Sequence, residues 1–202
     1  MLNRIRAIPL ERMHLALMLV LTFTTGINDA VGYLGLDKVF TGNMTGNVVI
    51  LGMALAGGSG LPILGPAMAL VGFMAGAAAG GRTLRRADRA WTLGTTLLFA
   101  TVAATMVALA VVLFASGDHP EHPVMITVTT IAATAMGIQA AAARAVAVKD
   151  VTTVVVTSTI TGLAADSFLG SGRGKGTGRR TAAVVSLIAG AALGVVLMRV
   201  HM

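Results

Sequence analysis

Long uncharged apolar stretches, separated by short polar or basic loops, dominate the pattern of this chain. Four of them come close to or exceed the ~20 apolar residues that a helix needs to cross a bilayer: 61–81, 90–116, 123–143 and 181–198. A fifth stretch, at 15–36, is interrupted only by Asp29. These stretches are apolar on all sides, too long for strands, and without alternation of polar and apolar residues. The pattern therefore predicts an all-α integral membrane protein.

Two further apolar segments, 39–57 and 151–170, differ from the others and are called the motif segments. The first carries two Thr-Gly-Asn triplets, at 41–43 and 45–47, and glycine and asparagine weaken a helix. The second has only 15 residues before Asp166, about 22 Å as a helix against a bilayer core of about 30 Å. We therefore predict that both motif segments are re-entrant or broken helices, which makes seven hydrophobic segments in total.

The distribution of Lys and Arg supports this interpretation. If all seven segments cross the membrane, the basic residues divide almost evenly between the two sides in either orientation, against the positive-inside rule. If each motif segment enters and returns on the same side, thirteen basic residues lie inside and only Lys38 and Arg199 lie outside. The sequence therefore predicts five full spans, two re-entrant segments and an N-terminus inside.

The chain also contains two halves in which similar features follow one another in the same order. Three features recur at offsets of 111 to 116 residues: Gly-Ile-Asn at 26–28 and Gly-Ile-Gln at 137–139, Thr-Gly at 45–46 and 161–162, and Gly76 and Gly190. This order predicts two related halves, each with a span, a motif and a second span.

We expect the first half at 13–81, a linking helix at 90–116 and the second half at 123–200, within a single polytopic membrane domain over 1–202. In the predicted topology the two halves begin on opposite sides of the membrane. They would therefore form an inverted repeat, an arrangement that recurs among transporters and channels.

Composition narrows the classes of function. Apolar residues make up 55% of the 202 residues and charged residues 11%, whereas a soluble domain has about 25% charged residues. This balance excludes an ordinary soluble enzyme and a disordered chain. There is no cysteine, so neither a disulfide nor a cysteine metal site is available. The net charge of +7 comes from short loops, where it indicates topology, and we expect no nucleic acid as a partner.

The motif residues resemble a known family, the YoaK family of bacterial membrane proteins, a domain of unknown function. Residues similar to its two signatures are Gly26-Ile27-Asn28-Asp29-Ala30, Val39-Phe40, Met44-Thr45-Gly46-Asn47, then Met136-Gly137-Ile138-Gln139 and the threonine-rich run 153–161. The likeness covers nearly the whole chain. It implies a multi-pass protein of the bacterial inner membrane, and it implies no established substrate.

Asp29 is the sharpest candidate for a functional residue. A carboxylate at the bilayer centre is unfavourable by roughly 2.5–3.5 kcal/mol, and such acids usually face a cavity. We expect Asp29 to bind a cation or carry a proton; the alternative is an acid that bonds to a neighbouring helix or pairs with Lys38. In the second half, Ala140 stands in the place of Asp29, so chemistry that depends on an acid would be asymmetric.

The other candidates are polar or small residues of the two motifs and their preceding spans. If the first motif segment unwinds, its hydroxyls, amides and freed carbonyls could line a polar site; alternatively, its glycines allow close helix packing, and threonines satisfy their own helix. Asp166 is expected to pair with nearby loop bases. The candidates for binding a solute or ion are Asp29, Asn28, Gly42, Asn43, Thr45, Gly46, Asn47, Gln139, Thr157 and Thr161.

Small residues at four-residue spacing predict close helix packing, within the chain or between two chains. The glycines concerned are Gly72, Gly76, Gly80, Gly190 and Gly194. Signatures such as HExxH and GxSxG are absent, and we expect no enzymatic activity, cofactor or metal site.

Our leading hypothesis is a small inner-membrane transporter or channel for a small polar solute or ion, acting as a homodimer in the lipid bilayer. Its site would lie where the two motif segments meet. The alternative is a non-transporting membrane subunit or sensor that docks a partner through its glycine-rich helix faces.

Overall fold

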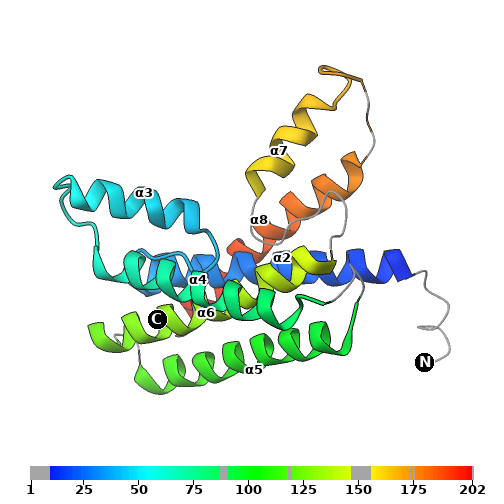
Figure 1. Ribbon diagram of the computed structural model, residues 1–202. Helices are drawn as coiled ribbons and strands as arrows, with labels where there is room; N and C mark the ends of the chain where they lie inside the picture. Colours follow the sequence, from blue (N-terminus) through cyan, green and yellow to red (C-terminus); the bar gives the residue numbers. More distant parts are fainter. Residues whose placement is uncertain are drawn as a thin grey trace.

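The computed structural model describes residues 10–86, 91–117, 120–146, 156–172, 174 and 176–201, and within these ranges it holds seven helices and no strand (Figure 1). Five are long: α2 (Leu10–Gly35), α4 (Leu64–Thr83), α5 (Leu93–Ser116), α6 (His122–Val146) and α8 (Thr177–His201). All five are long and apolar enough to cross a membrane. The prediction of an all-helical membrane protein with five such helices is confirmed.

The two short helices correspond to the motif segments. They are α3 (Met44–Leu55) and α7 (Val156–Ala165). With 12 and 10 residues, they extend only about 18 and 15 Å, which is less than a bilayer core of about 30 Å. Helix α3 packs against α4, and α7 packs against α8.

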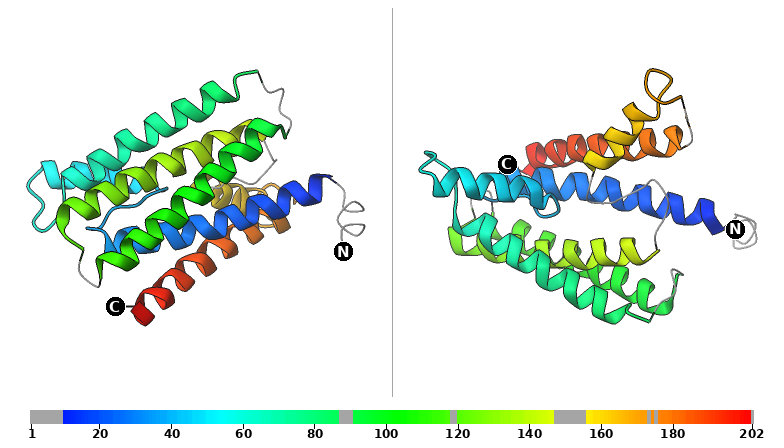
Figure 2. Two further views of the ribbon diagram at one scale, coloured as in Figure 1. Left: turned by 90° about the horizontal axis from the view of Figure 1, so that it is seen from below. Right: turned by 45° about the horizontal axis from the view of Figure 1, so that its top comes forward.

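The long helices form a bundle built on two parallel pairs (Figures 1 and 2). Helix α8 packs on α2, with Gly190 against Phe23 and Gly194 against Ile27, so both helices run in the same direction. Helix α4 packs in the same way on α6, and this second pair runs opposite to the first. Helix α5 covers the outer side of α6.

One end of this bundle carries most of the described basic side chains, and we call it the basic end. It contains the N-termini of α2, α5 and α8 and the C-termini of α4 and α6 (Figure 1). Its described basic residues are Arg12, Arg82, Arg85, Arg86, Arg144, Arg179 and Arg180. Lys38 and Arg199 lie towards the opposite end. The other basic residues lie outside the described ranges: Arg4, Arg6, Arg89, Lys149, Arg173 and Lys175.

Between α2 and α3 the chain reverses its direction. It turns at Asp37 and Lys38, which both have positive φ, 59° and 57°, a conformation that is uncommon outside glycine. Residues 39–43, which we call the returning segment, then run back beside α2: Val39 lies against Gly32. Helix α3 afterwards leads out again towards the end from which the segment came (Figure 1).

The returning segment is held in the apolar core of the bundle. Val39 is fully buried and forms a cluster with Ala69 of α4 and Ala133 of α6. Met44 and Phe73 pack on the same cluster. The first motif segment is therefore broken into a non-helical stretch and a short helix, one of the two forms that its glycines and asparagines predict.

The second motif segment ends in an ion pair. Arg180 of α8 donates from Nη1 to Asp166 Oδ2 at 2.7 Å and to the carbonyl of Gly162 at 2.7 Å. The expected pairing of Asp166 with a nearby base is confirmed. Residues 147–155, which include the first residues of the second motif segment, lie outside the described ranges.

Candidate functional site

Asp29 lies on α2 at the level that the returning segment reaches. Its Oδ1 accepts hydrogen bonds from the backbone N–H of Gly42 at 2.7 Å, from the N–H of Asn43 at 3.4 Å and from the Thr41 hydroxyl at 3.4 Å. Hydrogen bonds to a charged carboxylate are stronger than neutral ones. The donors directly precede the first turn of α3, where the helix dipole also favours negative charge. This contact, which we call the Asp29 latch, fixes the start of α3 to α2.

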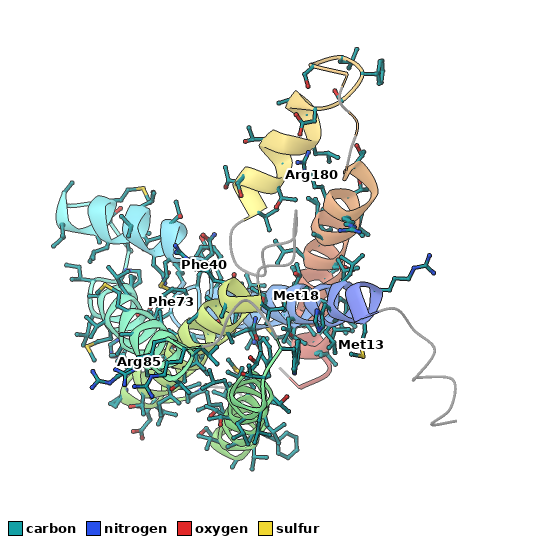
Figure 3. All side chains as sticks on the ribbon, turned by 45° about the vertical axis from the view of Figure 1, so that its right-hand side comes forward. Met13, Met18, Phe40, Phe73, Arg85 and Arg180 are labelled. Carbon is teal, nitrogen blue, oxygen red and sulfur yellow. The ribbon has the colours of Figure 1, made fainter. Side chains whose placement is uncertain are left out.

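Asn47 holds the same segment from the other side. Its Oδ1 accepts from the N–H of Phe40 at 2.9 Å, and its Nδ2 donates to the carbonyl of Phe40 at 2.6 Å. The side chain is fully buried. One amide thus satisfies both polar groups of a backbone residue that belongs to no helix. Phe40 itself lies between α3 and α4 (Figure 3) and stacks on Tyr33, with ring centroids 4.8 Å apart.

Asn43 has a different role, although it lies four residues before Asn47. It is the N-cap of α3, and its Oδ1 accepts from the N–H of Gly46 at 3.1 Å, a common way to satisfy a free donor at a helix start. The side chain is exposed. Asn43 is therefore an exposed cap of α3, whereas Asn47 forms a buried clasp around the backbone of Phe40.

Two glycines permit the close approach of backbone and side chains here. A Cβ at Gly42 would lie 3.1 Å from the Met136 methyl of α6 and 3.1 Å from the Thr25 methyl of α2. A Cβ at Gly46 would lie 2.7 Å from the ring of Phe40. A side chain at position 42 would therefore require the Met136 and Thr25 methyl groups to move by a few tenths of an ångström, whereas glycine fits between α2 and α6 without any such shift.

Helix α6 completes the site with the Gly-Ile-Gln phrase of the second half. Gln139 is buried, and its Nε2 donates to the Thr25 hydroxyl at 3.1 Å. Asn28 Nδ2 lies 3.6 Å from the sulfur of Met136. We call the group formed by Thr25, Asn28, Asp29, Gln139 and Thr41–Asn43 the polar centre.

Other candidates from the sequence do not join the polar centre. Thr45 is exposed on α3. Thr157 and Thr161 are exposed on α7, where the Thr161 hydroxyl donates to the carbonyl of Thr157 at 2.9 Å. Helix α7 lies beside α8 and away from α3 (Figure 1). Within the described residues, the neighbours of the first motif are therefore α2, α4 and α6, and the two motif helices do not meet as expected.

Sequence reasoning missed Thr25 as a member of the site. Its hydroxyl donates to the carbonyl of Leu21 at 2.8 Å and accepts from Gln139. Threonine is common in membrane helices and usually bonds its own helix, so its type gave no signal. Only the match between Gly-Ile-Asn and Gly-Ile-Gln hinted that α2 and α6 contribute equivalent positions.

The glycine-rich faces are covered within the chain. Gly72 and Gly76 of α4 lie against Thr130 and Thr134 of α6, and Gly80 lies against Ile138. Gly190 and Gly194 of α8 lie against α2 in the same manner. The question of packing within or between chains is thereby answered for this conformation. The alternative hypothesis, docking of a partner through these faces, loses the exposed surface that it needs.

Comparison with known proteins places these elements in a wider group. The family described as "Protein of unknown function (DUF1275)" matches residues 17–202, a range that begins within α2 and includes the six other helices. The UPF0700 transmembrane protein YoaK of Bacillus subtilis (strain 168) is 32% identical over 151 residues, which are 74% of this chain and 65% of that protein. The chain thus spans just under two thirds of that relative. No solved structure matches it.

Proposed function

The chain belongs to the DUF1275 family of YoaK-type membrane proteins, whose function is unknown, and we propose that it is a small transporter or channel of the bacterial inner membrane. Its substrate would be a small polar solute or ion. The observation that carries the proposal is the Asp29 latch, in which an acid within a membrane-competent helix holds a broken backbone segment. Acids at such positions are expensive to insert and generally serve ion or solute pathways.

The depth of the polar centre supports this proposal. Thr25 stands ten residues before the end of α2 at Gly35, which corresponds to about 15 Å along the helix, or half of a bilayer core of about 30 Å. Irregular backbone at this depth is tolerated only where it is buried in protein or lines a water-filled cavity. In this proposal the returning segment and α3 form a re-entrant unit that enters and leaves on the same side.

The pairing of the helices supports an inverted repeat. Exchange of α2 with α6 and of α4 with α8 converts the α2–α8 contact into the α6–α4 contact, and the exchanged helices run in opposite directions. Gly26 lies against the backbone of α8 as Gly137 lies against the backbone of α4. Transporters with inverted repeats bind their substrates near the midplane, where broken helices begin or end.

In the proposed mechanism the latch is the gate. A proton or cation at Asp29 weakens the attraction of the carboxylate for the N–H groups of Gly42 and Asn43, and the start of α3 is released. Asn28 and Gln139 then offer amide groups to the solute, and the glycine at position 42 lets the solute approach the backbone. A second copy of the chain would close the pathway on the lipid side, which makes the homodimer part of the proposal.

Proton flux into liposomes tests this function. Purified protein is reconstituted with the pH-sensitive dye pyranine inside, and a potassium diffusion potential drives protons inwards. We expect the wild type to exceed protein-free liposomes and Asp29→Asn to fall to their level. Asp37→Asn is the matched control, because Asp37 is also an acid but faces His122 at 3.5 Å beyond the end of α2.

The asparagine at position 29 keeps an oxygen that can accept from Gly42, so the variant tests charge rather than folding. Its elution profile in gel filtration is expected to equal that of the wild type. Equal flux through the wild type and Asp29→Asn would refute the role of Asp29. A wild type that conducts no more than protein-free liposomes, with sodium or potassium present, would refute proton- or cation-linked transport.

A further inference from the structure

A basic cavity, open to its surroundings and lined by exposed residues, lies at the C-terminal end of α4, on the basic end of the bundle. It has a volume of about 440 Å³ and is lined by Arg82, Thr83, Arg85 and Arg86. We propose that this cavity binds the phosphate of an anionic phospholipid headgroup. The inference is independent of transport and requires only that the protein lies in a membrane.

The three guanidinium groups have no acidic partner within the described part of the chain. The ion pairs described there join His122 to Asp37 and Arg180 to Asp166. Among the described residues, no side-chain hydrogen bond involves Arg82, Arg85 or Arg86. The Thr83 hydroxyl donates to the carbonyl of Ala79 at 2.9 Å, within its own helix. Arg180 shows the contrast, since its guanidinium is bound by a carboxylate and a carbonyl.

Three like charges around one hollow repel one another, and a phosphate would relieve that repulsion. The guanidinium group presents paired N–H donors that match two phosphate oxygens. The negative end of the α4 dipole also stabilises a cation such as Arg82, but this effect explains only one of the three arginines. Asp88 and Arg89 lie outside the described ranges.

The surface below the cavity favours a lipid over free phosphate. Val71 and Met74 of α4 are each 55% exposed, and Ala75 and Ala78 are exposed beside them. Their spacing of three and four residues places them on the helix face that continues to Arg82, and Arg85 follows in the turn after α4. Figure 3 shows Arg85 at the outside of the bundle, away from Phe40.

This face therefore offers an apolar track for an acyl chain and a basic cavity for the headgroup at its end. Basic pockets of this kind, on the side of the membrane rich in anionic lipid, recognise phosphate-bearing headgroups. A soluble phosphate would use the cavity and leave the track without a role. A phospholipid and inorganic phosphate can therefore be distinguished by whether one displaces the other from the cavity.

Native mass spectrometry of the detergent-solubilised protein, titrated with phosphatidylglycerol or phosphatidylcholine, tests the site. We expect phosphatidylglycerol to bind at least about tenfold more tightly than phosphatidylcholine, because only the former carries net charge. The variant with Arg82, Arg85 and Arg86 replaced by Gln is expected to lose this preference. The matched control, with Gln at Arg12, Arg144 and Arg179, removes three exposed arginines from the same end and is expected to keep it.

Two results would overturn the proposal. Equal loss of preference in both triple variants would show that the overall charge of the basic end, rather than the cavity, attracts the lipid. Displacement of phosphatidylglycerol by inorganic phosphate at equal concentration would assign the cavity to a soluble anion. If the Gln variant does not purify, Lys at the same three positions keeps the charge, and weaker binding than in the wild type is then expected because the paired N–H donors are lost.

Discussion

Two polar side chains of the site, Asp29 and Asn47, hold backbone rather than each other. Asp29 accepts from the N–H groups at the start of α3, and Asn47 clasps Phe40. The two side chains therefore supply hydrogen bonds to the backbone of residues 39–43, which a continuous helix would otherwise satisfy by itself. A break at membrane depth persists only when such partners are present, so these two residues make the returning segment possible.

Replacement of Asn47 by Ala is expected to destabilise the protein. The change leaves the N–H and the carbonyl of the half-buried Phe40 without partners, and a fully buried unsatisfied group is unfavourable by about 1–3 kcal/mol. Because Phe40 is only half-buried, we expect a loss of roughly 1–3 kcal/mol in the free energy of unfolding. Thermal denaturation in detergent, followed by circular dichroism, measures it.

Thr45→Ala is the matched control for this prediction, because Thr45 lies on the same short helix with an exposed side chain. It is expected to change stability by less than about 0.5 kcal/mol. If the two variants denature at the same temperature, the clasp does not hold the segment, and the returning segment needs another explanation.

At this scale the sequence identifies the type of residue more readily than its partner. Asp29 stands out because an acid in an apolar stretch is rare, and the twin Thr-Gly-Asn triplets stand out because they weaken a helix. The partners of Asp29 are backbone amides of Gly42 and Asn43, which no side-chain pattern reveals. Only the reversal at Asp37 and Lys38 brings them to α2.

At the scale of the element, the glycines decide how closely the long helices pack. Gly76 faces the carbonyl of Thr134, and Gly190 faces the carbonyl of Phe23. In both pairs the added Cβ would overlap the carbonyl of the opposite helix. Because each pair joins a helix of one half to a helix of the other, these contacts also join the two halves.

Gly76→Ala is expected to force α4 away from α6. The added methyl group overlaps backbone, which has no flexible side chain to move, and overpacking of this kind destabilises by about 1–3 kcal/mol. Gly81→Ala on the same helix is the control, since nothing lies within 4 Å of its Cβ. We expect that control to be neutral or stabilised by up to about 1 kcal/mol.

The unfolding temperature in detergent distinguishes these two variants. A Gly76→Ala protein as stable as Gly81→Ala would mean that α4 and α6 do not pack through this glycine. The tight α4–α6 contact would then need to be placed elsewhere on the two helices.

The number of helices, and which of them are long or short, can be predicted from the sequence. The residues at which they begin and end, and the helices that they contact, are harder to predict. Apolar length and the division of Lys and Arg predict five long helices and two short ones, and the short ones are α3 and α7. The first motif segment, expected at 39–57, is helical only from Met44 to Leu55, since its first residues are drawn back along α2. Hydropathy carries no information on that reversal, because an extended stretch and a helix can be equally apolar.

At the scale of the whole molecule, the distribution of basic residues agrees with the direction in which each long helix runs. The parallel pair α2 and α8 begins at the basic end, and the opposite pair α4 and α6 ends there. Loops rich in Lys and Arg remain on the cytoplasmic side. The orientation that satisfies this rule places Lys38 outside, next to the turn that starts the returning segment, with its Nζ 2.9 Å from the carbonyl of Gly60.

Labelling of single cysteines in intact cells tests this orientation and the inverted repeat together. The chain has no cysteine of its own, and Ser59 and Ser171 are exposed in the loops that follow α3 and α7. An impermeant thiol reagent is expected to modify Ser59→Cys and to spare Ser171→Cys until the cells are permeabilised. Each motif helix would then return to the side from which its chain entered, and the two would do so from opposite sides. Modification of both sites in intact cells would place α3 and α7 on the same side, a result that no inverted repeat allows.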